Sequence, residues 1–284
     1  MKTGFVIVNY NDFETTKKLI DNIKNYKIIE EIVVVDNNSK DKSLLNLNNL
    51  KIKNLTVLLN SENKGYSNAL NLGTKYLINK YHKLNIFVSN SDIEISNEKD
   101  LSKMVDLIKK DIVIVGPNIN THGNISKGWK IPTINQEIIF NLPILQNIMQ
   151  NRLFYNDSEY QNNSTNVDTV SGCFFLINSK HLEDINYFDD NVFLYYEENI
   201  LGVKTKKANK KIVVANKVII NHNHSVTIDK CLKKINKVKM QKKSQFYFEK
   251  NYNKANKLQL FLLKITAFIT IILLKVKYVI EDRI

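Results

Sequence analysis

The sequence contains few residues that break or cross-link a chain. It has only 8 glycines and 3 prolines in 284 residues, which excludes a collagen-like or low-complexity chain. Its 2 cysteines, Cys173 and Cys231, lie far apart and match neither a zinc nor a redox spacing. We therefore expect both thiols to be reduced and structural. A hydrophobic content of 43% is sufficient for one large α/β domain, or for one domain with an appendage.

The N-terminal segment lacks the features of a secretory signal. It reads MKTGFVIVNYN, with one lysine, a short apolar run and no small-residue cleavage site. We therefore expect a cytosolic chain.

Acidic residues are scarce in the C-terminal part. Residues 229–257 hold ten lysines and two acidic residues, and they carry +8 of the net charge of +13. Residues 258–284 add +2, so residues 1–228 carry only +3. A basic C-terminal element suits nucleic acid or an anionic membrane surface. Nucleic acid is disfavoured because no aromatic platform accompanies the lysines.

A long uninterrupted apolar run is also missing from the C-terminus. Residues 258–280 are strongly apolar, but the longest stretch without charge is residues 265–274. A spanning helix requires about 20 apolar residues. Lys264 and Lys275 lie about three helical turns apart and share a face, which favours a helix in the membrane interface. A helical hairpin packed on the body or in a dimer is the alternative, and a marginal span is a third.

The first 115 residues alternate between strand-like and helix-like patterns. Apolar, β-branched runs such as GFVIVNY and EIVVVD precede helix-like segments, the first with Asp12 as its N-cap. This order predicts a mostly parallel central sheet with helices on both faces. We expect a further strand pair in residues 167–178 and two short strands in residues 211–225. Ligands of such sheets bind at the carboxyl ends of the strands.

Three positions that follow predicted strands have two interpretations each. Asp36 could bind a nucleoside base or ribose, or it could cap its own turn. Gly65 precedes a helix whose N-terminus suits a diphosphate, or it is an ordinary loop glycine. Asp92 could hold a divalent cation against a diphosphate, or it could belong to a simple turn.

Two further pairs of residues are candidates for chemistry. His222 and His224 stand two residues apart and would point the same way on a strand, so they could bind a metal, although such pairs more often lie in the core or on the surface. Glu197 and Glu198 are adjacent carboxylates that would repel one another. One could be a catalytic base, or the pair could be a solvated helix start that the helix dipole favours.

Taken in order, these segments resemble one known family. The segments are VIVNYN, VVVDNNSKD, NKGYSNALNLG, NSD, SGCFFLI, FDDNVFLYYEE and HNHSVTI. They look like the landmarks of family 2 glycosyltransferases with the GT-A fold, and most closely the rhamnosyltransferase-like enzymes of bacterial surface-polysaccharide synthesis. The resemblance covers residues 4–228. It implies an inverting transfer of a sugar from a nucleotide-diphosphate donor to a glycan hydroxyl, in capsule, O-antigen or related synthesis.

The resemblance also implies roles for individual residues. The nucleotide pocket would be lined by Asn9, Tyr10, Asp36, Asn63, Gly65 and Asn71. Asp92 matches the last acid of the metal-binding Asp-x-Asp motif, whereas Asn90 stands where that motif has its first acid. The cation would be Mg²⁺ or Mn²⁺.

The histidine and glutamate pairs receive roles in the same way. His222 matches a histidine that helps to bind the metal or diphosphate, with His224 as the substitute. Glu198 matches the general base, and Glu197 would support the site or hydrogen-bond the acceptor. Trp129 could stack on the acceptor sugar or belong to the core.

The predicted organisation has two parts. Residues 1–228 form a GT-A catalytic domain, and residues 229–284 form a basic, then apolar, helical membrane-association element. We expect a peripheral protein on the cytoplasmic face of the bacterial inner membrane, with a nucleotide sugar and a lipid-linked glycan as substrates and no nucleic acid. A homo-oligomer is left open. The alternatives are a nucleotidyltransferase and an inactive scaffold of a polysaccharide assembly complex.

Overall fold

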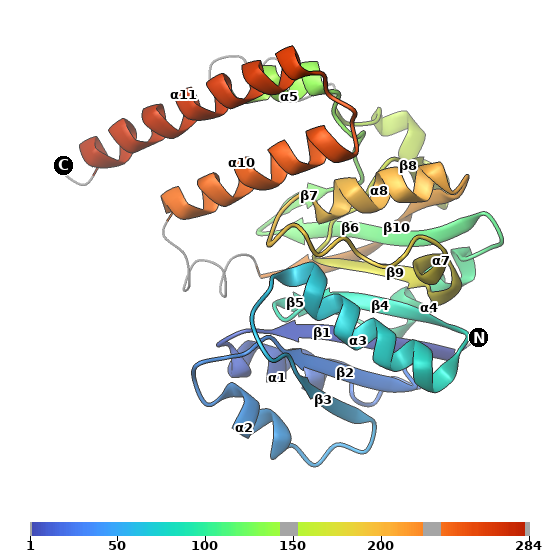
Figure 1. Ribbon diagram of the computed structural model, residues 1–284. Helices are drawn as coiled ribbons and strands as arrows, with labels where there is room; N and C mark the ends of the chain where they lie inside the picture. The colour runs from blue at the N-terminus through green and yellow to red at the C-terminus, as the bar shows by residue number, and fades with distance from the viewer. Residues whose placement is uncertain (1, 143–152, 224–233, 282–284) are drawn as a thin grey trace.

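The structure, a computed structural model, describes residues 2–142, 153–223 and 234–281. Its centre is a mixed sheet whose strands follow the order β3-β2-β1-β4-β9-β6-β10-β5, with β7 beside β6 and β8 beside β10 (Figure 1). The strands are β1 Lys2–Asn9, β2 Glu31–Asp36, β3 Leu55–Leu59, β4 Leu84–Asn90, β5 Ile93–Glu94, β6 Ile112–Thr121, β7 Asn124–Ser126, β8 Ser164–Val167, β9 Phe174–Asn178 and β10 Lys211–His222.

The predicted α/β class, a central sheet with helices on both faces, is confirmed, and the parallel pairing belongs mainly to the first half of the sheet. Strands β3, β2, β1 and β4 pair in parallel, whereas β9 pairs antiparallel with both β4 and β6. Strand β9 is inserted antiparallel between two strands that precede it in the chain, while β10 pairs in parallel with β6, so this half of the sheet is mixed.

Residues 211–225 were expected to form two short strands, and this prediction is wrong. Lys211–His222 form one strand, β10, whose pairing with β6 shifts register between Ala215 and Ile219. The backbone stays attached to its neighbours there, because the Asn118 side chain donates to the Asn216 carbonyl at 2.8 Å. A bulge therefore replaces the expected break.

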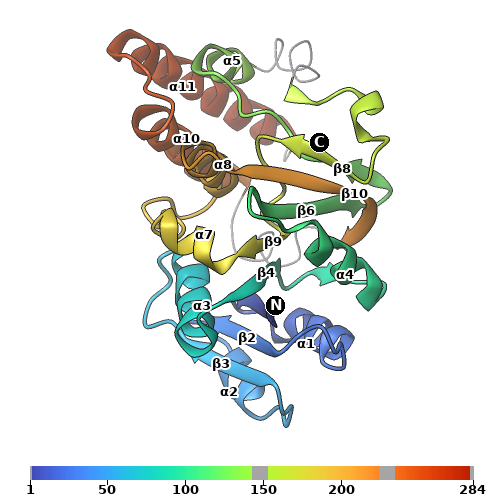
Figure 2. The same cartoon turned by 90° about the vertical axis from the view of Figure 1, so that its right-hand side faces the viewer.

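Helices cover both faces of this sheet. They are α1 Phe13–Ile23, α2 Ser43–Asn48, α3 Tyr66–Tyr81, α4 Glu98–Leu107, α5 Ile134–Phe140, η2 Asp157–Tyr160, α7 Ser179–Asp184, α8 Glu197–Lys207, α10 Lys234–Asn251 and α11 Lys257–Glu281. Figure 2 shows α3, α7 and α8 on one side of the sheet and α1 and α4 on the other. Strand β2 is buried along its whole length, as its continuous apolar run predicts.

One side of the core is centred on three aromatic rings. Phe87 stacks on Phe174 with ring centroids 5.7 Å apart, and Phe5 lies 5.8 Å from Phe87. These rings come from β1, β4 and β9, so they join the parallel strands to the antiparallel strand inserted beside them. The carboxyl ends of β1 and β4 are thereby held together.

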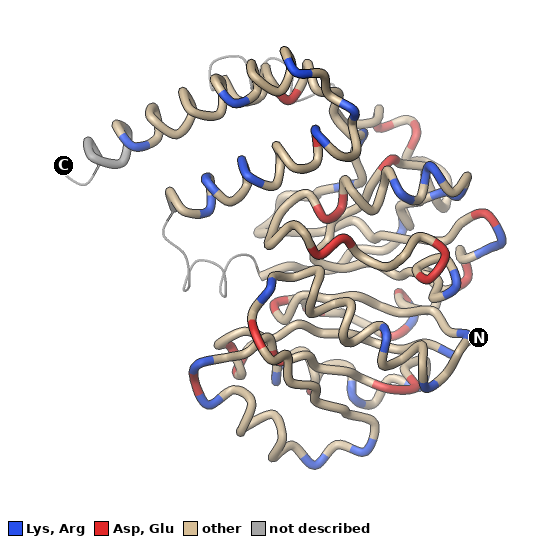
Figure 3. Tube along the Cα trace, in the orientation of Figure 1, with Lys and Arg blue, Asp and Glu red and all other residues tan. Residues whose placement is uncertain are grey.

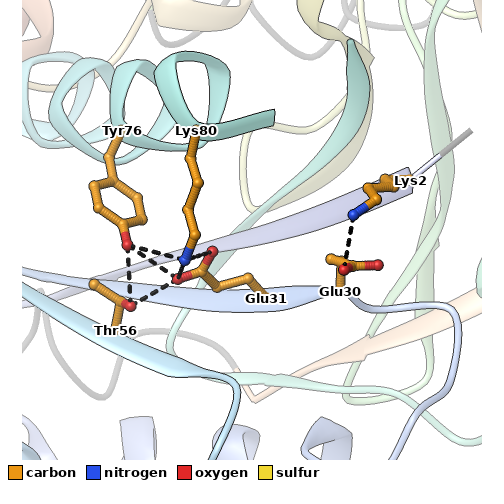
Figure 4. A network of polar contacts seen from close by, with 6 residues as sticks. All are labelled: Lys2, Glu30, Glu31, Thr56, Tyr76 and Lys80. Atoms are coloured by element: carbon orange, nitrogen blue, oxygen red, sulfur yellow. Dashed lines mark hydrogen bonds and ion pairs between the residues drawn. The ribbon is translucent and has the colours of Figure 1, made fainter. Parts of the chain in front are cut away.

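The opposite end of the sheet carries a network of polar side chains (Figure 4). Glu31, at the start of β2, accepts hydrogen bonds from Thr56 at 2.7 Å and from Lys80 at 2.9 Å. Burial would raise the pKa of Glu31, but the bonds from Lys80 and Thr56 outweigh it and lower that pKa. Tyr76 completes the network by donating to Glu31 at 3.1 Å. The network ties α3 to β2 and β3 and is structural.

The C-terminal helices α10 and α11 pack on the body. The ring of Phe248 in α10 lies 5.5 Å from the ring of Tyr196, just before α8, and Ser244 donates to the Leu194 carbonyl at 2.7 Å. Helix α11 lies against α5 and α10, and Thr270 donates to the Asn141 carbonyl. Figure 3 shows basic residues along α10 and α8. Helices α10 and α11 are therefore packed on residues of α5 and on the segment that leads into α8.

Candidate active site

A cavity of about 430 Å³ opens at the carboxyl ends of β1 and β4. It collects residues from the ends of β1 and β4, the N-termini of α3 and α8, and the end of β10. The predicted site residues that line it are Tyr10, Asn63, Gly65, Asn90, Asp92, Glu197, Glu198 and His222. Tyr10 and His222, 212 positions apart in sequence, thus line one cavity at the carboxyl ends of the strands, where ligands of such sheets bind.

Three predicted nucleotide-binding residues do not line the cavity. Asn9 is fully buried and donates to Asp36 at 2.8 Å, while it accepts from Thr16 at 2.7 Å. Asp36 also accepts from the backbone and hydroxyl of Ser39, so it caps its own turn. Asn71 holds the backbone of Phe188 through both its amide nitrogen and its oxygen. In this structure all three position the loops around the cavity.

Gly65 shapes the entrance to α3. Its φ of 104° lies in the left-handed region, and an added Cβ would lie 2.2 Å from the Phe193 carbonyl oxygen. The next residue, Tyr66, donates its backbone N–H to that same oxygen at 3.0 Å. Only glycine fits between this helix N-terminus and the loop that leads to α8. The residue both lines the cavity and permits the turn.

Asp92 and His222 form a pair at the cavity wall. His222 Nε2 lies 3.1 Å from Asp92 Oδ1, and the side chains are 12% and 7% exposed. Strand β5 pairs with β10 so that Ile93 faces His222, which brings the two together from 130 residues apart. Burial opposes a charge on His222, but its contacts with Asp92 and Cys173 outweigh burial and raise its pKa to about 10.

The structure adds Cys173 to the site, which the sequence placed among structural thiols. It lines the cavity, interacts with His222, and its sulfur lies 3.1 Å from Ser171 Oγ. Its only sequence signal is its place immediately before the apolar run of β9. Cys231, the other thiol, lies outside the described residues, as does His224.

Glu197 and Glu198 begin α8 and face the cavity rather than bulk solvent. Tyr195 and Tyr196 precede them with φ values of 72° and 69°, a conformation that turns the chain sharply into the helix. Glu198 Oε1 accepts from the Gly172 N–H at 3.2 Å. Glu197 Oε1 is buried without a hydrogen-bond partner in the described part of the chain. A solvated helix start is therefore excluded.

Burial makes both carboxyl groups more basic. It raises the pKa of Glu197 to about 8, with a further contribution from the charge of Glu198. Burial also raises the pKa of Glu198, against the effect of its bonds to backbone N–H groups. Carboxyl groups with raised pKa values in a cavity are typical of general acid–base chemistry.

The two halves of the site are neighbours in space. Glu198 binds Gly172, and Cys173, the next residue in the chain, interacts with His222. Glu198, on one wall of the cavity, can therefore accept a proton. The other wall holds His222, which suits an anion, and Asp92, which suits the cation bound to that anion.

The side chains in the cavity suit a cation that takes some of its ligands from the protein and others from a bound phosphate. No group of three or more His, Cys, Asp or Glu residues in the described ranges could hold a metal ion alone. Mg²⁺ typically takes one or two carboxylates from the protein and its remaining ligands from phosphate and water. The Asp92 carboxylate fits this requirement, and Asn90 lies in the same cavity. His222, charged beside Asp92, suits the phosphate rather than the cation.

The comparisons with known proteins follow the same lines. Residues 5–185 match the model of the family described as Glycosyl transferase family 2. The chain belongs to this family. It is 25% identical over 224 residues to the Low-salt glycan biosynthesis hexosyltransferase Agl10 of Haloferax volcanii, covering 78% of this chain and 67% of that protein. The family membership and the glycosyltransferase activity predicted from the sequence are thus confirmed.

Solved structures with the same fold are distant in sequence. A mannosyltransferase of Pyrobaculum calidifontis, in complex with GDP-Man and Mn²⁺, has a TM-score of 0.61 at 13% identity and matches 95% of this chain and 73% of its own. Residues 1–349 of S. aureus TarS have a TM-score of 0.56 at 16% identity, and the match covers 96% of this chain and 80% of that one. GalNAc-T7 with UDP, GalNAc and Mn²⁺ has a TM-score of 0.61 at 14% identity. The match covers 78% of this chain and 44% of GalNAc-T7.

This glycosyltransferase has part of its candidate site beyond the family match. The matched residues end at 185, so Glu197, Glu198 and His222 lie outside them. The fold nevertheless brings these three side chains into the cavity that the matched strands form. Their roles are argued below from geometry.

Proposed function

We propose that this glycosyltransferase moves a sugar from a nucleoside-diphosphate donor to a glycan hydroxyl with inversion at the anomeric carbon. The observation that carries the proposal is the single cavity in which Glu198 lies close to the Asp92–His222 pair. Family membership favours this activity over a nucleotidyltransferase or an inactive scaffold.

The transfer requires a base and a stabilised leaving group. The acceptor oxygen attacks the anomeric carbon and forms the new C–O bond. The bond from that carbon to the phosphate oxygen breaks, and its electron pair leaves with the nucleoside diphosphate. The acceptor proton passes to Glu198, whose pKa burial raises, so that it holds a proton more strongly than an exposed carboxylate does. Glu197 lies beside it in the same cavity and would support the site or hydrogen-bond the acceptor.

The other wall of the cavity would receive the diphosphate. Asp92 would supply a carboxylate to Mg²⁺ or Mn²⁺, which would neutralise negative charge on the departing diphosphate when bound. His222, charged beside Asp92, would bind the diphosphate itself. Two structures with the same fold contain Mn²⁺, one with UDP and one with GDP-Man. Tyr10, Asn63 and Gly65 line the same cavity and would contact the nucleotide.

The polarity of α11 supports a membrane location. Thr266 and Thr270 turn toward the body, where both contact Asn141, while apolar side chains face outward. The outward apolar residues are Leu258, Phe261, Leu262, Ile265, Phe268, Ile269, Ile272, Leu273 and Val276. Residues 257–276 are long and apolar enough to cross a membrane, by length and composition alone.

This outward apolar face suggests the class of acceptor. A water-soluble helix hides its apolar side, so α11 is arranged as a helix that contacts lipid. Its exposed Lys264 and Lys275 are long enough to reach headgroups from the interface. We infer that the acceptor is a lipid-linked glycan. We predict that the protein uses this acceptor at the cytoplasmic face of a bacterial inner membrane. A role in capsule or O-antigen synthesis is part of the same proposal.

Calorimetric binding of a panel of nucleoside diphosphates and nucleotide sugars, with and without Mn²⁺ or Mg²⁺, tests the donor site. We expect one base to bind, with affinity increased by the metal and lost in Asp92→Ala. The exposed Asp157→Ala is the matched control and should bind as the parent does. Absence of nucleotide binding under every metal condition would reject the proposal.

A further inference from the structure

A second cavity, of about 440 Å³, adjoins the first. Residues of α5, α8, α10 and α11 enclose it together with Trp129. Both cavities are lined by Tyr195 and Glu198. The carboxyl group that we propose as the base therefore stands between the donor cavity and this one.

The second cavity contains a buried polar group that lacks a partner. Gln245 is 2% exposed, and its Nε2 donates to Glu137 at 2.6 Å and to Asn141 at 3.1 Å. Its Oε1 has no hydrogen-bond partner among the described residues. Buried polar atoms are rarely left unpaired, so a hydrogen-bond donor from a ligand is the natural partner of this oxygen.

Lys242 supplies further hydrogen-bonding capacity. Its Nζ donates to Asn141 Oδ1 at 2.5 Å, and an ammonium group has two more donors to offer. Burial lowers the pKa of this lysine. The exposed Gln241, one residue earlier in α10, lines the same space.

Trp129 supplies an aromatic surface. It lines the cavity and is partly exposed, and its indole N–H is directed to Asn199 Oδ1 at 3.3 Å. The polar edge of the indole is therefore occupied while the ring contributes to the cavity wall. Phe140, Val238 and Leu274 add apolar surface. An aromatic wall beside amide and ammonium donors suits a sugar ring, which has apolar C–H faces and hydroxyl edges.

We propose that this second cavity is the acceptor-sugar subsite, in which Gln245 and Lys242 bind hydroxyl groups and thereby select the acceptor. This inference rests on the proposed function. Both residues belong to α10, outside the family match that ends at residue 185. The helices that would contact the membrane therefore also select the sugar, which places the head of a lipid-linked glycan beside Glu198.

The chain provides its own reporter for this cavity. Trp129 is the only tryptophan in the sequence, so its fluorescence reports on the site. The full-length protein is titrated with octyl glycosides of glucose, galactose, rhamnose and N-acetylglucosamine, and with octanol as the control for the alkyl chain. We expect at least one glycoside to change the Trp129 fluorescence saturably, while octanol does not. An equal response to octanol, or no response to any glycoside, would overturn the saccharide assignment.

Variants of α10 locate the binding. Lys242→Met should weaken the glycoside response about tenfold, which corresponds to about 1.4 kcal/mol. The neighbouring Lys243→Met is the matched control, because Lys243 is exposed and does not line the cavity. Val238→Phe should block the cavity by filling it and covers the case in which Lys242→Met fails to fold. Unchanged affinity in both Lys242→Met and Val238→Phe would reject the subsite.

Nucleotide binding, measured on the same proteins, separates this inference from the proposed function. Lys242→Met should leave nucleotide affinity within about twofold of the parent. A glycoside response without nucleotide binding would support the saccharide site and reject the donor chemistry. Nucleotide binding without a glycoside response would support the donor chemistry and reject the saccharide site.

Discussion

At the scale of single residues, Glu198 has the central role in the proposed chemistry. Replacing Glu198 by Gln keeps the shape of the side chain but removes its ability to accept a proton. We expect transfer to fall by about 10²–10⁴-fold, the usual contribution of a general base. Release of nucleoside diphosphate measures transfer, and calorimetry should show donor affinity unchanged. Glu197→Gln is the matched comparison, and a larger loss in Glu197→Gln than in Glu198→Gln would assign the base to Glu197.

Glu197 also makes the stability of the protein depend on pH. Its pKa rises from 4.5 to about 8 on folding, because burial disfavours the charged form. The folded state retains a proton that the unfolded state releases between these values, so the free energy of unfolding falls as pH rises through that window. The slope is at most about 1.4 kcal/mol per pH unit for one proton.

Denaturant unfolding at a series of pH values tests this. Glu197→Gln should make the free energy of unfolding less dependent on pH between 4.5 and 8. Glu62→Gln replaces a 60% exposed carboxylate and should leave the slope unchanged. An equal slope in the parent and Glu197→Gln would show that Glu197 titrates alike in the folded and unfolded states.

At the scale of elements, the turn before β9 positions the base. A Cβ on Gly172 would lie 2.6 Å from Glu198 Oε1, so Gly172→Ala must displace either the turn or the carboxylate. We expect transfer to fall at least about tenfold, since small misplacements of catalytic groups are costly. Gly123→Ala is the control for glycine replacement away from the site: an added Cβ there meets nothing within 4 Å, and its φ of 87° confines any backbone strain to the turn between β6 and β7. Full activity of Gly172→Ala would show that the placement of Glu198 tolerates movement.

Helix α11 provides a second prediction at this scale. Phe268 and Leu273 are 63% and 48% exposed on its outward side. Changing both to Glu should abolish co-sedimentation with lipid vesicles, because charged groups resist burial among acyl chains. Leu45→Glu alters a residue on α2 that is 60% exposed and should leave sedimentation unchanged. Vesicle binding by the α11 variant equal to that of the parent would exclude this face as the lipid contact.

At the scale of the whole molecule, charge is concentrated where the membrane contact is proposed. Residues 229–284 carry +10 of the net charge of +13. Lysines near an anionic surface contribute about 1 kcal/mol each, and salt screens this attraction. Binding to vesicles that contain phosphatidylserine should therefore weaken steeply as salt is raised. Binding to phosphatidylcholine vesicles should be weaker and nearly independent of salt, and equal binding to both would leave the apolar face as the sole contact.

The sequence by itself determined the local helices and strands and placed several polar residues at one edge of the sheet. Apolar β-branched runs are buried strands because each residue in them is favoured on a sheet covered on both faces. Polar residues directly after those runs lie at one edge of the sheet, since parallel strands end together. Tyr10, Asn63, Asn90 and Asp92 reached the cavity for this reason. The glutamates at the start of α8 were identifiable from the family motif.

Only the tertiary structure decided how distant segments pair and which polar groups are already engaged. Nothing local shows that β9 inserts antiparallel between β4 and β6, or that His222 meets Asp92 across 130 residues. Asp36 looks free in the sequence, yet Asn9 and Ser39 bind it in the fold. The second cavity exists only because α10 and α11 pack beside Trp129. Periodicity reports burial along one element, whereas a site depends on contacts between elements far apart in the chain.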